Sequence, residues 1–172
     1  MIFVNRPNPS DAPPWCPYFF NLVPEDNLMD AFENNRKSIV DLINTIPADK
    51  ENFRYANDKW TIKEVLIHLL DCERYYAYGA FSATHHESFE LGFDRDAHIK
   101  NGNIESRSLK GIAEEFQILR TATVLLFGNF TDEMLDAKCI HLNHVYTARS
   151  FGWMLVGHCI HHINFLNEKY LF

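Results

Sequence analysis

The chain has 172 residues, of which 47% are hydrophobic, and its formal net charge is -7 at pH 7. This length suits one domain and is sufficient to bury a real core. The negative charge argues against a surface that neutralises nucleic-acid phosphates, and no uninterrupted apolar run is long enough to span a bilayer. We therefore expect a folded domain with neither a nucleic-acid partner nor a membrane segment.

The prolines are concentrated near the N-terminus, because all seven lie between Pro7 and Pro47 and six lie at or before Pro24. This predicts an extended N-terminal arm over residues 1–24, followed by the main domain over residues 25–172. A loose tail is the alternative, but many aromatic rings would be costly to leave in water. Four of them are available to fasten the arm to the body: Trp15, Tyr18, Phe19 and Phe20. The first residues lead at once into prolines and carry no signal-peptide pattern.

Apolar periodicity predicts long helices in the main domain. They run from about 26 to 46, from the Thr61 cap onward, from 109 to near 128, and from about 150 to 170. Pro47 ends the first helix, and Thr61 with Glu64 has the spacing of a capping box. Residues 131–135 read as a short helical turn. We find no strand signal.

Between about Phe81 and Ser108 the helical pattern dissolves into polar residues. A connection this long in a compact domain is often functional, so it is either one wall of a site or a plain surface crossover. The fold class that follows is all-α: a four-helix bundle with up-down-down-up topology, a Pro-rich N-terminal arm and a long middle crossover.

The four cysteines lack CxxC spacing and need not be bridged, which favours a reducing cytoplasm. They are Cys16, Cys72, Cys139 and Cys159. Cys139, His141 and His144 have a spacing that suits zinc. However, these residues lie on no predicted amphipathic element, and a further ligand would have to come from elsewhere. We therefore do not predict a zinc site in this link.

The last predicted helix carries two histidines on its apolar face. His158 and His162 are four residues apart and fall in the middle of that stripe, whereas His161 falls at its edge. Buried imidazoles need partners for their nitrogens, and a metal ion satisfies two histidines one turn apart. Hydrogen bonds inside a polar core are the alternative. His68, on the flank of the second helix, is a structural histidine or a third ligand that the bundle brings to this pair.

No common nucleotide, zincin or hydrolase-elbow motif occurs in the chain. Two other motifs carry a resemblance. The segment 58–73, with Trp60, the Thr61 cap and His68, resembles the second-helix motif of the DinB-like superfamily. The segment 157–162, Gly-His-Cys-Ile-His-His, followed by Glu168-Lys169-Tyr170, is similar to the final-helix motif of that superfamily. Gly92-Phe93-Asp94 is similar to its crossover.

This resemblance, which covers most of the chain from about residue 27, implies a DinB-like four-helix bundle that holds one divalent metal ion through His68, His158 and His162. Zinc and nickel both suit imidazole ligands. The resemblance also implies a cytoplasmic protein and often a homodimer. Known members include thiol-dependent transferases and metal-dependent hydrolases.

Three imidazoles with an open position are typical of a catalytic metal site. Such a metal lowers the pKa of a bound water or thiol. Our first hypothesis is a metal-dependent transferase for a small-molecule substrate, in which a low-molecular-weight thiol (glutathione, bacillithiol or mycothiol) attacks an electrophile. The second is a metal-dependent hydrolase, and the third is a non-catalytic metal-binding stress-response protein.

Carboxylates near the predicted ligands are candidates for orienting them or for assisting catalysis. Asp71 and Glu73 follow His68 on the same helix, and Asp94 belongs to the crossover. By helical phase Asp71 is the closer of the first two to the histidine face. The sequence names no general base.

Overall fold

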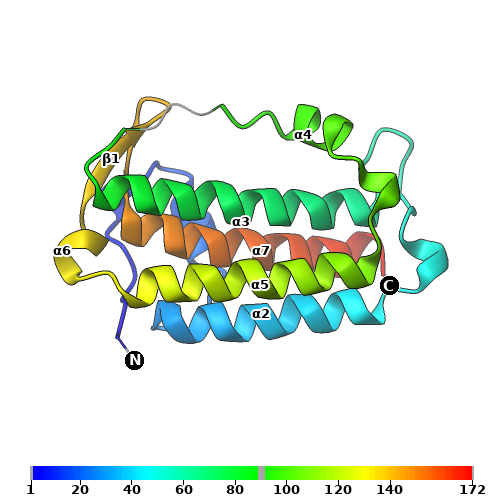
Figure 1. Ribbon diagram of the computed structural model, residues 1–172, viewed down its shortest axis with the longest axis horizontal. Helices are drawn as coiled ribbons and strands as arrows, with labels where there is room; N and C mark the ends of the chain where they lie inside the picture. The colour runs from blue at the N-terminus through cyan, green and yellow to red at the C-terminus, as the bar shows by residue number, and fades with distance from the viewer. Residues whose placement is uncertain (1, 89–91, 172) are drawn as a thin grey trace.

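The computed structural model of the protein describes residues 2–88 and 92–171, and the predicted all-α bundle is confirmed (Figure 1). Its long helices are α2 (Leu28–Thr45), α3 (Ile62–Thr84), α5 (Leu109–Gly128) and α7 (Ala148–Lys169). In Figure 1, α2 and α7 run in one direction, whereas α3 and α5 run in the opposite direction. The chain therefore passes up, down, down and up through the bundle.

The helices begin where local side chains satisfy their free backbone N–H groups. Asn27 caps α2, and Thr61 forms the predicted capping box with Glu64 at the start of α3. At α7, the side chains of Thr147 and Ser150 form a second box. The starts of α2 and α7 lie within about two residues of the predicted positions, which is the normal precision of such boundaries.

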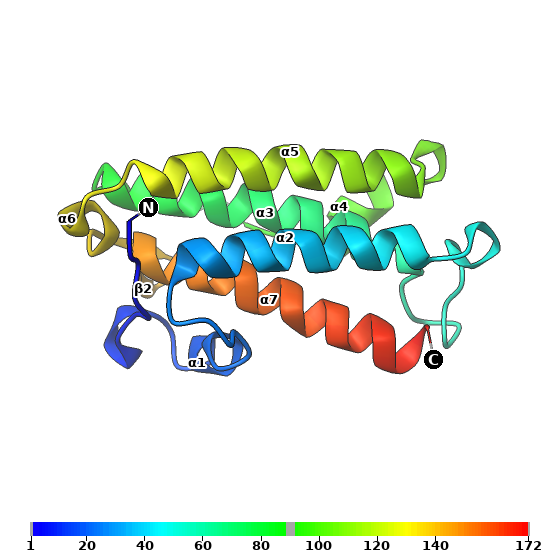
Figure 2. The ribbon, with the colours of Figure 1, turned by 90° about the horizontal axis from the view of Figure 1, so that it is seen from below.

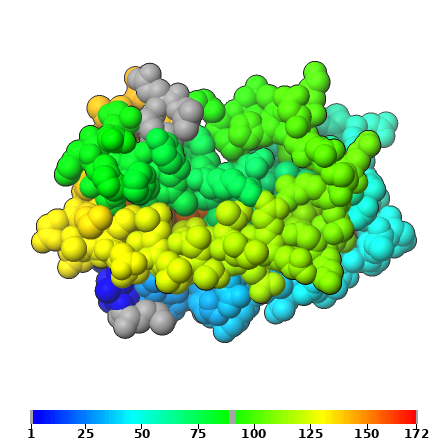
Figure 3. All heavy atoms as spheres, in the orientation of Figure 1, coloured from blue at the N-terminus to red at the C-terminus, as the bar shows by residue number. Residues whose placement is uncertain are grey.

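The bundle places α3 beside α7, and this neighbour relation positions the candidate site. Both α3 and α2 pack against α5 and α7, so α3 and α2 occupy opposite corners of the bundle. On the face shown in Figure 3, side chains of α3 and α5 meet along most of their length. Buried apolar residues fill the interior, including Phe32, Phe116 and Phe127.

The link between α5 and α7 differs from the prediction. The expected helical turn is present as α6 (Asp132–Leu135), but it is followed by an antiparallel hairpin of β1 (Lys138–His141) and β2 (His144–Thr147). The prediction of no strand was therefore wrong. Leu142 and Asn143 form the turn with φ angles of 46° and 64°, the left-handed region that a two-residue hairpin needs.

The N-terminal arm is also more ordered than the extended segment that we predicted. It contains a short 3₁₀ turn (Pro9–Asp11) and the helix α1 (Cys16–Phe20). Figure 2 shows α1 beside α7, and the two helices are in contact. A Cβ added at Gly157 would lie 2.2 Å from the carbonyl oxygen of Phe19, so glycine allows this approach. Phe20 is buried, whereas the other aromatic anchors are partly or largely exposed.

The remaining connections contain short helical elements. The α2–α3 link includes a 3₁₀ turn (Ala48–Lys50), and the long crossover contains α4 (Arg95–Asn101) and another 3₁₀ turn (Ile104–Ser106). The sequence pattern did not predict α4, which packs against α3. Within the described ranges, every helix is too short or too polar to cross a membrane.

Candidate metal centre

Two neighbouring helices bring the three predicted ligands to one point. His68 lies on α3, in the second turn after the Thr61 cap, while His158 and His162 lie one turn apart on α7. Their ligand atoms all lie within 4.8 Å of one another. Among the described residues, this is the cluster of histidine, cysteine and carboxylate groups whose spacing could hold a metal ion.

The distances within the cluster suit an ion. The Nε2 atoms of His158 and His162 are 3.2 Å apart, and two nitrogens that bind one tetrahedral zinc ion are about 3.3 Å apart. The ring centroid of His68 lies 5.2 Å from that of His158 and 5.1 Å from that of His162. The three rings therefore surround a common point, instead of stacking along one helix.

Burial keeps these histidines neutral. It lowers the pKa of His68 to about 4 and that of His162 to about 3, and the charge of Arg95 lowers both pKa values further. The pKa of His158 is well below its ordinary value, first through burial and then through the other histidines. Neutral imidazoles present the lone pairs that a metal ion requires.

The hydrogen bonding of the cluster leaves room for a further partner. The thiol of Cys72 lies 3.5 Å from Nε2 and 3.7 Å from Nδ1 of His68. Nδ1 of His162 is buried without a hydrogen-bond partner among the described residues. The Nε2 atoms of His158 and His162 face each other at 3.2 Å, and two neutral imidazoles in this arrangement can both bind one cation through these atoms. The residues present therefore fit a divalent metal ion.

Aromatic rings enclose the cluster on several sides. The ring centroid of Trp60 lies 5.1 Å from that of His68, and the ring of Phe93, from the crossover, lies 5.9 Å from the same histidine. On the α7 side, Phe19 of the arm lies 5.7 Å from His158. This shell limits the access of water to the cluster, and lower access strengthens electrostatic interactions inside it.

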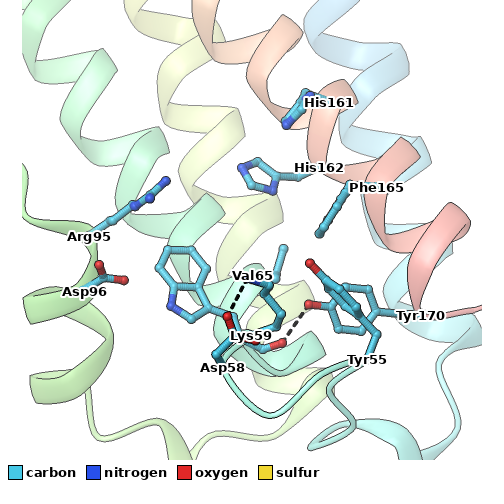
Figure 4. A pocket seen from close by; sticks show the side chains of 11 residues that line it. Tyr55, Asp58, Lys59, Val65, Arg95, Asp96, His161, His162, Phe165 and Tyr170 are labelled. Carbon is cyan, nitrogen blue, oxygen red and sulfur yellow. Dashed lines mark hydrogen bonds and ion pairs between the residues drawn. The ribbon is translucent and has the colours of Figure 1, made fainter.

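A pocket of about 380 Å³ opens beside the cluster and is lined by His162 (Figure 4). Its other walls come from the loop before α3, from the start of α4 and from the last turns of α7. Four aromatic and four charged side chains contribute to the lining, and Arg95 lies on the side opposite the two tyrosines. The aromatic lining residues are Tyr55, Trp60, Phe165 and Tyr170. A small molecule in this pocket would lie against His162.

The structure does not place the three predicted carboxylates against the histidines of the candidate metal site. Asp71 pairs with Arg74 and His98, at 3.7 and 3.6 Å. Glu73 is buried against Arg120, and Asp94 accepts hydrogen bonds from backbone N–H groups at the start of α4. In the ranges that the structure describes, these contacts already occupy the carboxylates.

His161 and the histidines of the hairpin lie outside the cluster. His161 lies at the pocket edge, where its Nδ1 is 3.1 Å from the hydroxyl of Tyr18. The Nε2 atom of His141 is 2.6 Å from the hydroxyl of Tyr75, while the ring of His144 packs edge-on against Trp15.

Sequence reasoning missed the residues that shape the pocket. Trp60 and Tyr170 lie inside the two motifs, and the hydroxyl of Tyr170 donates to the backbone oxygen of Trp60 at 2.7 Å. Their place in both motifs was a usable signal. Tyr55 and Arg95 lie in segments without periodicity, so nothing local marked them.

The comparisons with known proteins agree with this architecture. A family model described as the DinB superfamily matches residues 31–166. The fold is similar to that of YfiT from Bacillus subtilis, described as a probable metal-dependent hydrolase with an unusual four-helix bundle topology. The TM-score is 0.71 at 16% sequence identity, over 95% of this chain and 90% of that one. No curated protein matches the chain.

Proposed function

The chain belongs to the DinB superfamily, and we propose that it is a metal-dependent enzyme in which His68, His158 and His162 hold one divalent ion. The observation that carries this proposal is the convergence of three neutral imidazoles beside a pocket for a small molecule. Zinc and nickel are the ions that suit this ligand set best. A purely structural or storage role would not require a pocket beside the histidines.

A divalent ion at this position supplies a Lewis acid that brings the pKa of a bound thiol or water toward neutrality. The protein contributes ligands that stay unprotonated at neutral pH. It also contributes the aromatic shell, which reduces the access of water to the histidines. The pocket holds the second reactant next to His162.

We favour transfer of a small thiol to an electrophile as the reaction. The thiol releases its proton to solvent, its sulfur forms a bond to the electrophilic carbon, and the leaving group departs with the electrons of the broken bond. A thiolate needs no further base once it has formed. This suits a site whose three predicted carboxylates all interact with other groups within the described residues.

Hydrolysis is the second candidate. The fold neighbour from Bacillus subtilis is described as a probable metal-dependent hydrolase, which favours an attacking water in a site of this shape. Water must lose a proton during the reaction, and a general base normally assists this step. We therefore expect hydrolysis of activated bonds only.

The cellular setting that we propose follows from composition. The four cysteines are buried and unbridged, which suits a reducing cytoplasm. The negative net charge suits small-molecule chemistry without a nucleic-acid partner. We also propose a homodimer, and the mass of the purified protein in solution would test it.

The test begins with elemental analysis, where we expect about one equivalent of divalent metal. The protein is then assayed with a chromogenic electrophile and glutathione, bacillithiol, mycothiol or cysteine, and separately with an activated ester without thiol. Chelator-sensitive loss of free thiol would support transfer. Chelator-sensitive ester cleavage without thiol would support hydrolysis instead. Absence of both activities in metal-loaded protein would contradict an enzymatic role in these two classes.

A further inference from the structure

Arg95 is a cation in the pocket that forms no ion pair with a carboxylate of the described residues. It opens α4, and Figure 4 shows its guanidinium pointing toward His162. Its contact with the wall is over the ring of Trp60, 5.7 Å from the ring centroid. In the described part of the chain, no carboxylate oxygen lies within ion-pair distance of Arg95. An arginine in this position has donors left for a ligand.

The charge balance of the site calls for an anion. Arg95 and His162 line the same pocket, and the guanidinium is directed toward the imidazole ring (Figure 4). Three neutral imidazoles do not compensate a divalent ion, so a loaded site would place two further positive charges near this guanidinium. An anionic group between them would relieve the repulsion.

The other charged residues of the pocket limit the charge of that anion. Asp58 is paired with Lys59 at 2.8 Å, so these two residues largely cancel. Asp96 follows Arg95 in the first turn of α4 and lines the same pocket. Two carboxylates in the lining disfavour a dianionic phosphate more than a singly charged carboxylate. A thiolate or hydroxide bound to the ion would offset one of its two positive charges, and Asp96 offsets another charge of the site. The single positive charge that is left favours a monoanion.

The aromatic wall opposite Arg95 defines the rest of the ligand. The ring centroids of Tyr55 and Tyr170 are 5.0 Å apart, and that of Phe165 lies 5.8 Å from Tyr55. Because Tyr170 donates its hydroxyl hydrogen to Trp60, its ring is held in place. Such a wall suits a flat apolar body.

We propose that the pocket binds a small carboxylic acid with a flat apolar body, in which Arg95 binds the carboxylate and the reacting end lies against His162. This deepens the proposed function, since it rests on the same site and names the class of substrate. Arg95 is then a specificity residue, because a bidentate guanidinium–carboxylate pair discriminates against neutral analogues.

The probes are phenylacetate and its neutral analogue phenylacetamide, titrated calorimetrically into the metal-loaded protein. We expect the acid to bind at least tenfold more tightly than the amide. In Arg95→Met this preference should disappear, whereas Arg95→Lys should retain part of it. Lys100→Met is the matched control, because it removes a cation from the same short helix at an exposed position outside the pocket lining. This control should bind phenylacetate like the unaltered protein.

Equal binding of acid and amide by the unaltered protein would overturn the proposal. So would an unchanged preference in Arg95→Met, because a carboxylate that binds only the metal needs no arginine. Circular dichroism and metal content are measured on every variant. They show whether a change in binding comes from the loss of Arg95 itself or from a loss of fold or of bound metal. Protein that contains no metal but still prefers the acid through Arg95 would contradict the proposed function and leave the carboxylate site intact.

Discussion

Helix α3 carries two buried polar clusters on different faces, and they are built on opposite rules. On one face Glu73 accepts two hydrogen bonds from Arg120, at 2.9 and 2.8 Å, and a third from Thr123 at 2.7 Å. On the other face His68 meets two residues of its own kind. The first cluster contains opposite charges that satisfy each other, whereas the second contains three neutral acceptors that need an outside partner.

This difference indicates that the first cluster stabilises the fold, whereas the second is suited to bind a ligand. A buried ion pair with complementary hydrogen bonds is complete when the chain folds, and nothing further binds there. Buried side chains of one kind cannot satisfy one another's hydrogen-bonding groups, so such a cluster indicates a binding site for a ligand. By this criterion Glu73 is a structural residue of the bundle, although it is close to His68 in sequence.

The largest expected effect comes from breaking the complete cluster. Because Arg120 is fully buried, we expect Glu73→Gln to lower the free energy of unfolding by about 3–5 kcal/mol, through the charge left without its partner. Urea denaturation would measure the change. Glu115→Gln is the matched control, since Glu115 pairs with Arg74 and Arg107 while remaining 31% exposed, and its loss should cost at most about 1 kcal/mol.

If Glu73→Gln kept full stability but lost metal, the roles assigned to the two clusters would be reversed. Replacing both partners sharpens the test. Glu73→Met combined with Arg120→Met should recover much of the stability that either single change removes, because no uncompensated charge remains.

The second effect concerns the incomplete cluster. We expect His162→Ala or His158→Gln to lower metal affinity by about 100-fold or more, because each removes one of three ligands. Elemental analysis and competition with a chelator would measure it. His161→Gln, which alters the histidine bonded to Tyr18, should retain about one equivalent of metal. Equal metal content in the His161 and His158 variants would refute the ligand assignment.

The third effect is a dependence of stability on pH in the metal-free protein. The folded pKa values of His68 and His162, about 4 and about 3, lie below the ordinary value of about 6.5. Their neutral burial therefore contributes stability above pH 6.5 that is lost as the pH falls toward 4, because the unfolded chain takes up protons first. We expect a slope of about 1.4 kcal/mol per pH unit for each such histidine.

Urea denaturation in chelator between pH 7 and pH 5 would measure this slope. His162→Ala should reduce it by the contribution of one histidine. A slope that does not change in this variant would show that the acid sensitivity arises elsewhere in the chain.

The smallest effect concerns the arm that covers the cluster. Gly157→Ala places a methyl group against the backbone of Phe19, so we expect α1 to shift and the free energy of unfolding to fall by about 1 kcal/mol or more. Gly128→Ala is the control, because the nearest atom to an added Cβ there lies 3.8 Å away. Thermal unfolding of both variants would test this, and equal midpoints would contradict the close approach.

The sequence predicted the elements whose signals are local and repeated. The long helices have regular apolar spacing, and the capping box of Thr61 and Glu64 marks the start of α3 without reference to the rest of the fold. His158 and His162 could be paired because one helix carries both of them. His68 lies on a different helix, so assigning it to the same site required either the packing of the bundle or the resemblance of the two motifs to the DinB-like superfamily.

The features that the sequence did not predict have short signals or depend on contacts that are distant in sequence. Each hairpin strand has four residues, and its turn uses Leu142 and Asn143 instead of an Asn-Gly pair, so no strand signal rises above the surroundings. The helix α4 spans seven residues in a polar crossover. Arg95 became a pocket residue because the crossover returns along α3, and that placement depends on tertiary structure alone.

The arm has a consequence for how the protein is made. Asn5 accepts hydrogen bonds from Arg149 and from Trp153, across separations of 144 and 148 residues. Asn5 is therefore synthesised long before its partners in α7 exist. Contacts so distant in sequence form slowly. In the interval between synthesis and docking of the arm, the arm does not cover the histidine face of α7. A metal ion that binds at the proposed site would then have its most open route to the three histidines.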